Sequence, residues 1–292
     1  MTVFLQQLIN GLSLGSIYAL IALGYTMVYG IIKLINFAHG DIYMLGAYIG
    51  FLAITYLHVG FFPAILLAMA GSAIIGVVIE RIAYKPLRHA TRIAALITAI
   101  GVSYFLEAGT QRIMGAGAKA FPQVLSDEAI LFAGLRITYQ QIYIFITTIV
   151  LMVILQFIVK KTKIGRAMRA VSTDTDAARL MGINVDRTIS FTFAIGSALA
   201  GAAGVLVGIY YSSINPLMGM LPGIKSFIAD VFGGIGIIPG AMFGGFFIGI
   251  CEALVAGYGG SLFKDAVVYI ILIIILVIKP AGLLGKNVKE KV

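Results

Sequence analysis

The chain has 292 residues, of which 60% are hydrophobic and only 11% charged, and its mean hydropathy is +1.03. A water-soluble domain carries roughly 25% charged residues, so the composition excludes that class. The formal charge of +9 is better explained by membrane insertion than by nucleic-acid binding, because membrane proteins concentrate Lys and Arg in their cytoplasmic loops. The single cysteine, Cys251, excludes an intrachain disulfide and a metal site built from paired thiolates.

Apolar segments along the chain predict an all-α, polytopic membrane bundle that forms one transmembrane domain over residues 1–292. A full crossing takes roughly 20 apolar residues. The segments cover residues 11–32, 41–56, 61–79, 93–113, 141–159, 188–210, 224–237, 240–257 and 266–278. The seventh and the last are short for a crossing, and Pro239 interrupts the stretch between the seventh and the eighth. This pattern predicts broken or half-crossing helices among about eight or nine membrane segments.

The basic residues predict the orientation of the bundle. Of the 21 Lys and Arg residues, 16 lie at Lys33, in the loops 81–92 and 160–187, or in the tail 279–291. The positive-inside rule makes this side cytoplasmic. Nine crossings would then leave the N-terminus outside and the C-terminus in the cytoplasm. On the outer side, two short apolar runs flank Gly134 in the loop 114–140, which fits either a small hairpin or an irregular connector.

Glycines recur at four-residue spacing within the apolar segments. Such spacing places small residues on one helix face, where two backbones can approach closely. The pairs and triplets are Gly46 with Gly50, Gly204 with Gly208, Gly236 with Gly240 and Gly244, and Gly245 with Gly249. The pattern fits generic helix packing, and it also fits a bundle that shifts around a narrow pathway.

Acidic residues in or beside the apolar segments need partners, because a bare charge in hydrocarbon is costly. Glu107 lies five residues before Arg112, and Asp230 lies five after Lys225, so we expect each to neutralise its neighbour. Glu252 has no cation nearby in its own segment. It is therefore the best candidate to face a water-filled pathway, although a hydrogen bond between helices would satisfy it equally well.

The cytoplasmic loop 160–187 predicts a short capped helix. Thr173 and Asp176 have the spacing of a capping box, and Asp174 adds negative charge at the helix start. Gly182 is placed to end the helix in a left-handed conformation, and we expect Asp186 to cap the next membrane helix.

Because so short a helix is marginal alone, it needs a surface to pack on. Ala177, Ala178, Leu180 and Met181 are apolar, and Arg179 could anchor them. They fit a partner protein at the cytoplasmic face; the alternative is a helix that lies on this chain's own bundle.

The same loop resembles the coupling loop of permease subunits of ATP-binding cassette importers, which carries a Glu-Ala-Ala-x-x-x-Gly signature. Here the signature reads Asp176-Ala177-Ala178 followed by Gly182. Within that superfamily the whole chain resembles the high-affinity branched-chain amino acid permease group. The matching stretches are 10–24, 36–41, 80–88, 96–103, 178–185, 232–245 and 279–285. Departures are Ala99 for a common Thr, Ile237 for a small polar residue, and Lys279 for Arg.

The resemblance implies a transport subunit of the prokaryotic inner membrane, not an enzyme, with a cytoplasmic C-terminus. It implies a second homologous permease subunit as a hetero-dimer partner, two cytoplasmic ATP-binding subunits docked on the loop, and an extracytoplasmic amino-acid-binding protein. Leucine, isoleucine and valine are the implied substrates. No cofactor is expected on this chain: it lacks the G-x-x-x-x-G-K-[ST] motif, so ATP and Mg²⁺ would be held by the partner subunits.

Two breaks between apolar segments are the candidate substrate pathway. Unwound backbone and helix ends in a membrane can bind the carboxylate and ammonium of a zwitterion. The candidate residues are Asn36, His39, Gly40, Asp41, Gly234, Gly236, Pro239 and Gly240, together with Glu252. The alternative is that both breaks are connecting turns.

Two other functions stay open from the sequence. A permease of the same group for urea or short amides would share every architectural feature. A stand-alone channel or ion-coupled carrier would need no docking helix, and an aquaporin-like channel would need two Asn-Pro-Ala loops, which the chain lacks. A metal site is not expected, because His39, His58 and His89 have no partner at ligand spacing.

Overall fold

Long apolar helices dominate the structure, a computed structural model that describes residues 2–34, 36–88, 90–126 and 128–285. Seven helical spans within these residues are long and apolar enough to cross a membrane. They are α1 (Thr2–Ile32), α2 (His39–Leu57), α3 (Phe61–Ile79, continued by a π turn Glu80–Tyr84 and a 3-10 turn Lys85–Leu87), α4 (Arg92–Met114), α5 (Tyr139–Lys161), α8 (Val185–Tyr211) and α10 (Ile238–Tyr258). The predicted polytopic helical bundle is confirmed.

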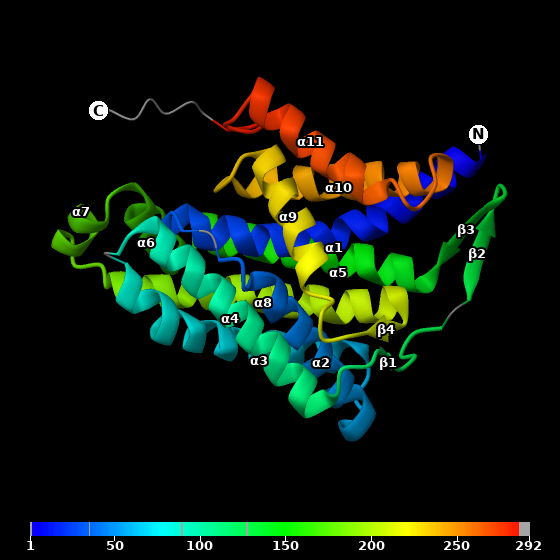
Figure 1. The fold of residues 1–292 in the computed structure, drawn as a ribbon, viewed down its shortest axis with the longest axis horizontal. Coiled ribbons are helices and arrows are strands. Elements are labelled where there is room, and N and C mark those ends of the chain that lie inside the picture. Colours follow the sequence, from blue (N-terminus) through cyan, green and yellow to red (C-terminus); the bar gives the residue numbers. More distant parts are fainter. Residues whose placement is uncertain (1, 35, 89, 127, 286–292) are drawn as a thin grey trace.

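Two shorter helices, α9 (Met220–Gly233) and α11 (Lys264–Ile278), correspond to the seventh and last predicted segments. The 14 residues of α9 extend about 21 Å at 1.5 Å per residue, which is less than a hydrocarbon core of roughly 30 Å. In Figure 1, α9 crosses α1 at a steep angle instead of following it. The break expected at Pro239 is present, because α9 ends at Gly233 and Pro239 lies in the first turn of α10.

Helices α1 and α8 form the centre of the bundle. In their most apolar stretches 78% and 83% of the residues are buried, against 22% to 33% for α3, α4 and α5. The peripheral helices expose large apolar side chains such as Phe105, Ile113 and Phe157. In a bilayer these side chains face lipid or other membrane subunits, so their exposure is compatible with a stable fold.

Glycines bring the central helices close together, as the four-residue spacing predicted. A Cβ on Gly15 of α1 would lie 2.8 Å from Cα of Phe246 in α10, and one on Gly204 of α8 would lie 2.6 Å from N of Ala47 in α2. The triplet Gly236, Gly240 and Gly244 is different, because Gly236 precedes α10 and has a φ of 85°. That residue belongs to a turn, and its predicted place on a helix face was wrong.

The loop on the predicted outer side forms a hairpin, one of the two alternatives that the sequence left open. Strands β2 (Ala129–Phe132) and β3 (Leu135–Thr138) pair antiparallel. Ala133 and Gly134, which join them, both have positive φ, as a tight two-residue hairpin turn requires. A second antiparallel pair joins β1 (Lys119–Ala120) to β4 (Ser213–Ile214). This second pair connects two loops that are distant in sequence, and both pairs lie at the same end of the bundle.

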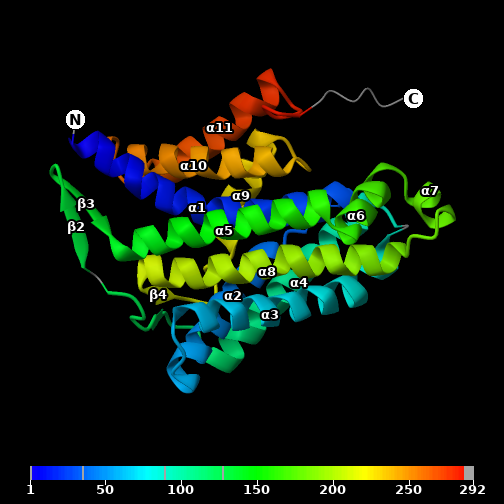
Figure 2. The ribbon, with the colours of Figure 1, turned by 180° about the vertical axis from the view of Figure 1, so that it is seen from behind.

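The opposite end carries α6 (Lys163–Thr173) and α7 (Thr175–Leu180), as both ribbon views show (Figures 1 and 2). The basic segment after α3 lies at this end too, because Arg88 contacts Asp186 at the start of α8. The two basic loops that the sequence assigned to one side are therefore adjacent. His89 and the C-terminal residues 286–292 lie outside the described residues.

Candidate functional site

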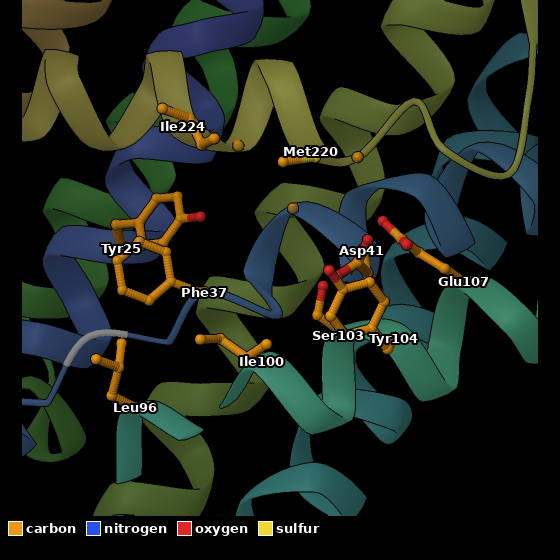
Figure 3. Close-up of a pocket in the computed structure, with 13 residues that line it drawn as sticks. Tyr25, Phe37, Asp41, Leu96, Ile100, Ser103, Tyr104, Glu107, Met220 and Ile224 are labelled. Carbon is orange, nitrogen blue, oxygen red and sulfur yellow. The ribbon is translucent and has the colours of Figure 1, made fainter. Parts of the chain in front are cut away.

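A cavity of about 340 Å³ lies where the N-terminal ends of α2 and α9 meet α4 (Figure 3). Its wall is mostly apolar, with Phe37, Ile100, Met220 and Ile224 around it. Small-molecule sites commonly have volumes of roughly 300–1,000 Å³ and apolar walls with a few placed polar groups. This cavity has both properties.

Close contact between two glycines allows the two helix ends to meet at the cavity. A Cβ on Gly40, the second residue of α2, would lie 2.5 Å from the carbonyl O of Gly219, the residue before α9. The same substitution at Gly219 would place a Cβ 2.8 Å from Oδ1 of Asp41. The first-turn N–H groups of a helix have no partner within the helix. The start of α9 therefore presents partial positive charge to the cavity.

Acidic groups form the polar part of the cavity. The carboxyl group of Asp41 lies beside Ser103 and Glu107 of α4 (Figure 3). Asp41 is buried, and its Oδ1 has no hydrogen-bond partner among the described residues. Two neighbouring carboxyl groups repel each other when both are charged, and a cation between them removes that repulsion. The cavity is thus suited to a ligand with an ammonium group.

The first candidate break is divided between the cavity and the wall behind it. Gly40 and Asp41 line the cavity, but Asn36 and His39 do not. Asn36 Oδ1 accepts a hydrogen bond of 2.8 Å from the Tyr84 hydroxyl. The buried His39 ring packs edge-on against Tyr25, with ring centroids 4.8 Å apart. Tyr25 itself lines the cavity, so His39 lies directly behind that wall.

The second candidate break lies at the other end of α9 and does not line this cavity. Gly234 has a φ of 112°, and Gly240 packs against Gly233. The N–H groups of Leu283 and Leu284 donate to the carbonyls of Phe232 and Gly233 at the end of α9. The segment therefore ends α9 and binds the C-terminal part of the chain. A pathway role for Gly234, Gly236, Pro239 and Gly240 stays a prediction.

The partners of Glu252 are a lysine and a tyrosine hydroxyl that belong to other helices. Its Oε1 lies 2.8 Å from Nζ of Lys225 in α9, and its Oε2 accepts a hydrogen bond of 2.8 Å from the Tyr18 hydroxyl in α1. Lys225 Nζ also lies 2.5 Å from Oδ1 of Asp265 in α11. We call the buried Tyr18, Lys225 and Glu252, together with the partly exposed Asp265, the buried charge cluster. A pathway role for Glu252 stays a prediction.

Both expected ion pairs within a helix were wrong. Lys225 pairs with Glu252, whereas Asp230 accepts a hydrogen bond from Thr26. Glu107 lies beside Asp41 in the cavity, and no ion pair joins it to Arg112 among the described residues. Five residues along an α-helix turn the side-chain direction by about 140°, so such residues do not share a face.

The short helix α7 is present, but its caps differ from the prediction. Asp174 is the N-cap, and its Oδ1 accepts from the N–H groups of Asp176 and Ala177 at 2.9 Å. Thr173 ends α6 and donates its hydroxyl to the carbonyl of Arg169. The predicted capping box of Thr173 and Asp176 was therefore wrong.

The end of α7 agrees with the sequence, and the start of α8 does not. Gly182 has a φ of 79° and follows the last turn of α7, as predicted. Asn184 caps α8 by accepting from the N–H of Arg187. Asp186, which we expected to be this cap, instead pairs with Lys85 and Arg88.

The two faces of α7 have different surroundings. Ala178 is buried against the chain's own bundle, whereas Leu180 is 89% and Met181 82% exposed. Ala177 is exposed as well, and Arg179 lies 3.9 Å from Asp176 at the surface. Packing on the bundle through Ala178 and docking of a partner on Leu180 and Met181 are thus compatible.

Sequence reasoning missed several residues of the cavity. Ser103 and Glu107 are four residues apart on α4 and so share one face; this polar pair in an apolar segment was a usable signal. Gly219 and Met220 could not be found in this way, because they reach the cavity only through the packing of α9 against α2.

Comparisons with known proteins agree over nearly the whole chain. The family described as "Branched-chain amino acid transport system / permease component" matches residues 7–276. The permease protein BraD of the high-affinity branched-chain amino acid transport system of Pseudomonas aeruginosa is 46% identical, over 99% of this chain and 98% of that protein. The corresponding LivH protein of Escherichia coli (strain K12) is 45% identical with the same coverage. A probable LivH of Methanocaldococcus jannaschii is 30% identical over 94% of this chain and 90% of that protein.

Among solved structures, a chain of PsaBC from Streptococcus pneumoniae in complex with Fab is similar. The TM-score is 0.50 at 13% sequence identity, and the match covers 95% of this chain and 92% of that chain. At this identity the likeness concerns the fold alone.

Proposed function

The chain belongs to the family of branched-chain amino acid transport permeases, and we propose that it is the membrane subunit of an ATP-binding cassette importer that carries leucine, isoleucine and valine across the inner membrane. The observation that carries this proposal is the identity of 45% to 46% over nearly the full length of permeases named for that transport. The cavity supports it independently through its size and polarity.

The cavity fits a zwitterion with an aliphatic side chain. The substrate carboxylate would lie at the start of α9, where first-turn N–H groups and the helix dipole favour negative charge. The ammonium group would lie against Asp41 and Glu107. Phe37 and Ile100 would contact the side chain of leucine or valine. Each part of the substrate thus has a complementary part of the wall.

We further propose three kinds of partner. The exposed side chains of Leu180 and Met181 would dock on one of two cytoplasmic ATP-binding subunits, which would hold ATP and Mg²⁺. A second, homologous permease would cover the exposed face of α4 beside the cavity, where the large side chains of Tyr104 and Phe105 are exposed. An amino-acid-binding protein would deliver substrate from the outer side.

The other candidate functions are not favoured. A neutral amide such as urea has no ammonium group to neutralise the two carboxyl groups of Asp41 and Glu107. A stand-alone channel or ion-coupled carrier has no partner subunit to bind the exposed residues of α7. The full-length relatives are, moreover, permeases of amino acid transport systems.

The proposed function is tested by purifying the tagged chain from its native membrane and assaying the complex in proteoliposomes with its binding protein. We expect two ATP-binding subunits and a second permease to co-purify, with leucine uptake that requires ATP.

Leu180→Asp should lose the ATP-binding subunits. The matched control is Leu262→Asp, because Leu262 is 91% exposed at the opposite end of the bundle. Uptake without ATP would contradict the importer, and retention of the ATP-binding subunits by Leu180→Asp would contradict the docking assignment.

Removing the charge at the cavity should weaken substrate binding. A hydrogen bond to a charged group contributes about 1.5–3 kcal/mol, so Glu107→Gln and Asp41→Asn should each raise the leucine concentration for half-maximal uptake by about 10-fold or more. The measurement is the concentration dependence of uptake in proteoliposomes. Glu128→Gln is the control, because Glu128 is exposed in the outer loop. An unchanged half-maximal concentration in both cavity variants would remove these carboxyl groups from the binding site.

A further inference from the structure

The segment 80–88, which follows α3, forms a network of charged groups with the start of α8. Glu80 is fully buried; its Oε1 accepts from Arg88, and its Oε2 accepts a hydrogen bond of 2.6 Å from the Ser190 hydroxyl. Arg88 also donates to Oδ1 of Asp186 at 2.5 Å, and Lys85 Nζ lies 2.7 Å from Oδ2 of the same carboxylate. This network joins the end of α3 to the first turns of α8.

The network lies directly next to the docking helix α7. Only four residues separate the last residue of α7, Leu180, from the start of α8 at Val185. Within this link the N–H of Ile183 donates to the carbonyl of Ala178 at 3.0 Å, and Asn184 caps α8. Because this link is short and hydrogen-bonded, α7 can move little relative to α8. A displacement of α7 therefore reaches Asp186 and its two cationic partners.

The other end of the same segment reaches the wall of the cavity. The buried Tyr84 packs its ring against Phe193 of α8, with centroids 5.5 Å apart, and donates its hydroxyl to Asn36 Oδ1 at 2.8 Å. The carbonyl of Asn36 accepts from the N–H of His39, the first residue of α2. Phe37, between these two residues, and Asp41, two residues after His39, line the cavity.

The Tyr84 contact determines how Asn36 is held. Asn36 is buried, and its Nδ2 has no hydrogen-bond partner among the described residues. The Tyr84 hydroxyl is thus the recorded partner of this side chain. Tyr84 also ends a π turn, a rare backbone form that occurs often at functional sites. A hydrogen bond in the low-dielectric interior is stronger than one in water, so the Tyr84 hydroxyl holds the Asn36 side chain in place.

We propose that Glu80, Tyr84, Arg88 and Asp186 are positioning residues that transmit the movement of α7 to the cavity, with the Tyr84–Asn36 hydrogen bond as the last connection. This inference rests on the proposed function. None of these four residues lines the cavity; they set the position of the segment 36–41 according to the position of α7. Substrate binding and ATP hydrolysis are coupled through them.

The test is Tyr84→Phe, which removes one hydroxyl and keeps the ring, in the complete transporter with its binding protein. We expect the amount of leucine taken up per ATP hydrolysed to fall at least about fivefold, the lower end of typical coupling between two sites. ATP hydrolysis itself should continue, because the docking surface is unchanged. The matched control is Tyr56→Phe at the other end of α2, where the side chain is 71% exposed; its ratio should equal that of the wild type.

A double-variant cycle separates transmission from a general loss of stability. If Asp186→Asn and Tyr84→Phe act on one network, the double variant should lose no more coupling than the more severe single variant. A wild-type ratio in Tyr84→Phe, or additive losses in the double variant, would overturn the inference. Absence of ATP-dependent leucine uptake by the wild-type complex would instead contradict the proposed function, so the two failures are distinguishable.

Discussion

Replacing Gly204 of α8 with valine should prevent normal assembly of the bundle. A Cβ at this position would lie 2.6 Å from N of Ala47 and 3.1 Å from C of Gly46, and it would also strike the carbonyl O of Tyr43. All three are backbone atoms of α2, so no rotamer change can relieve the clash. Overpacking typically costs about 1–3 kcal/mol and occasionally more. We expect a loss at or above the upper end of that range.

Gly101→Val on α4 is the matched control for this prediction. A Cβ on Gly101 meets no heavy atom within 4 Å, and the substitution is the same. The measurement is the yield of membrane-inserted chain and its thermal unfolding in detergent, with the subunit expressed alone. Gly204→Val should be recovered poorly and unfold at a lower temperature, whereas Gly101→Val should resemble the wild type. Equal stability of the two variants would show that α2 and α8 are not packed as closely as described.

Removing Lys225 should be the most damaging change to the buried charge cluster. Breaking a buried ion pair by deleting one partner costs about 3–5 kcal/mol, because the remaining charge is left uncompensated. In Lys225→Met the partners that the buried carboxylate of Glu252 keeps among the described residues are the Tyr18 hydroxyl and Lys264, whose Nζ is 3.8 Å away. In Glu252→Gln, by contrast, Lys225 keeps Asp265 at 2.5 Å. We therefore expect Lys225→Met to lower the unfolding temperature more than Glu252→Gln.

A double variant checks the reason for that difference. Buried ion pairs can often be replaced by apolar residues of similar volume without loss of stability. Lys225→Met combined with Glu252→Met should therefore unfold at a higher temperature than Lys225→Met alone. If the double variant were the less stable of the two, an unpaired Glu252 charge would not be the source of the damage.

Much of the fold was predictable because a bilayer constrains it strongly. A membrane-spanning backbone must satisfy its own hydrogen bonds, so long apolar segments become helices. The nine predicted segments accordingly lie on α1 to α5 and α8 to α11. The end of α7 at Gly182 was predictable for a local reason, because it needs a positive φ that glycine adopts at no steric cost. The hairpin at Gly134 was one of two alternatives that the sequence left open.

The candidate site was predictable only in part. Gly40 and Asp41 of the first predicted break line the cavity, but the two breaks do not line it together, since they lie at opposite ends of α9. Glu107 was assigned to a partner five residues away, although that spacing puts the two side chains on different faces of α4. Ser103 was overlooked.

The amino-acid sequence by itself determined the class of protein, the positions of its helices, the sharing of one side by the two basic loops, and the exposed short helix that ends at Gly182. These properties depend on hydropathy, charge and turn chemistry, which are local in the chain. The tertiary structure alone decided which charges pair and where the cavity lies. Lys225 meets Glu252, Arg88 meets Asp186, and α9 meets α2 at Gly40 and Gly219. Those contacts depend on the rotation and depth of each helix relative to its neighbours. Close packing at glycines sets this rotation and depth, and the local sequence around each contact does not reveal them.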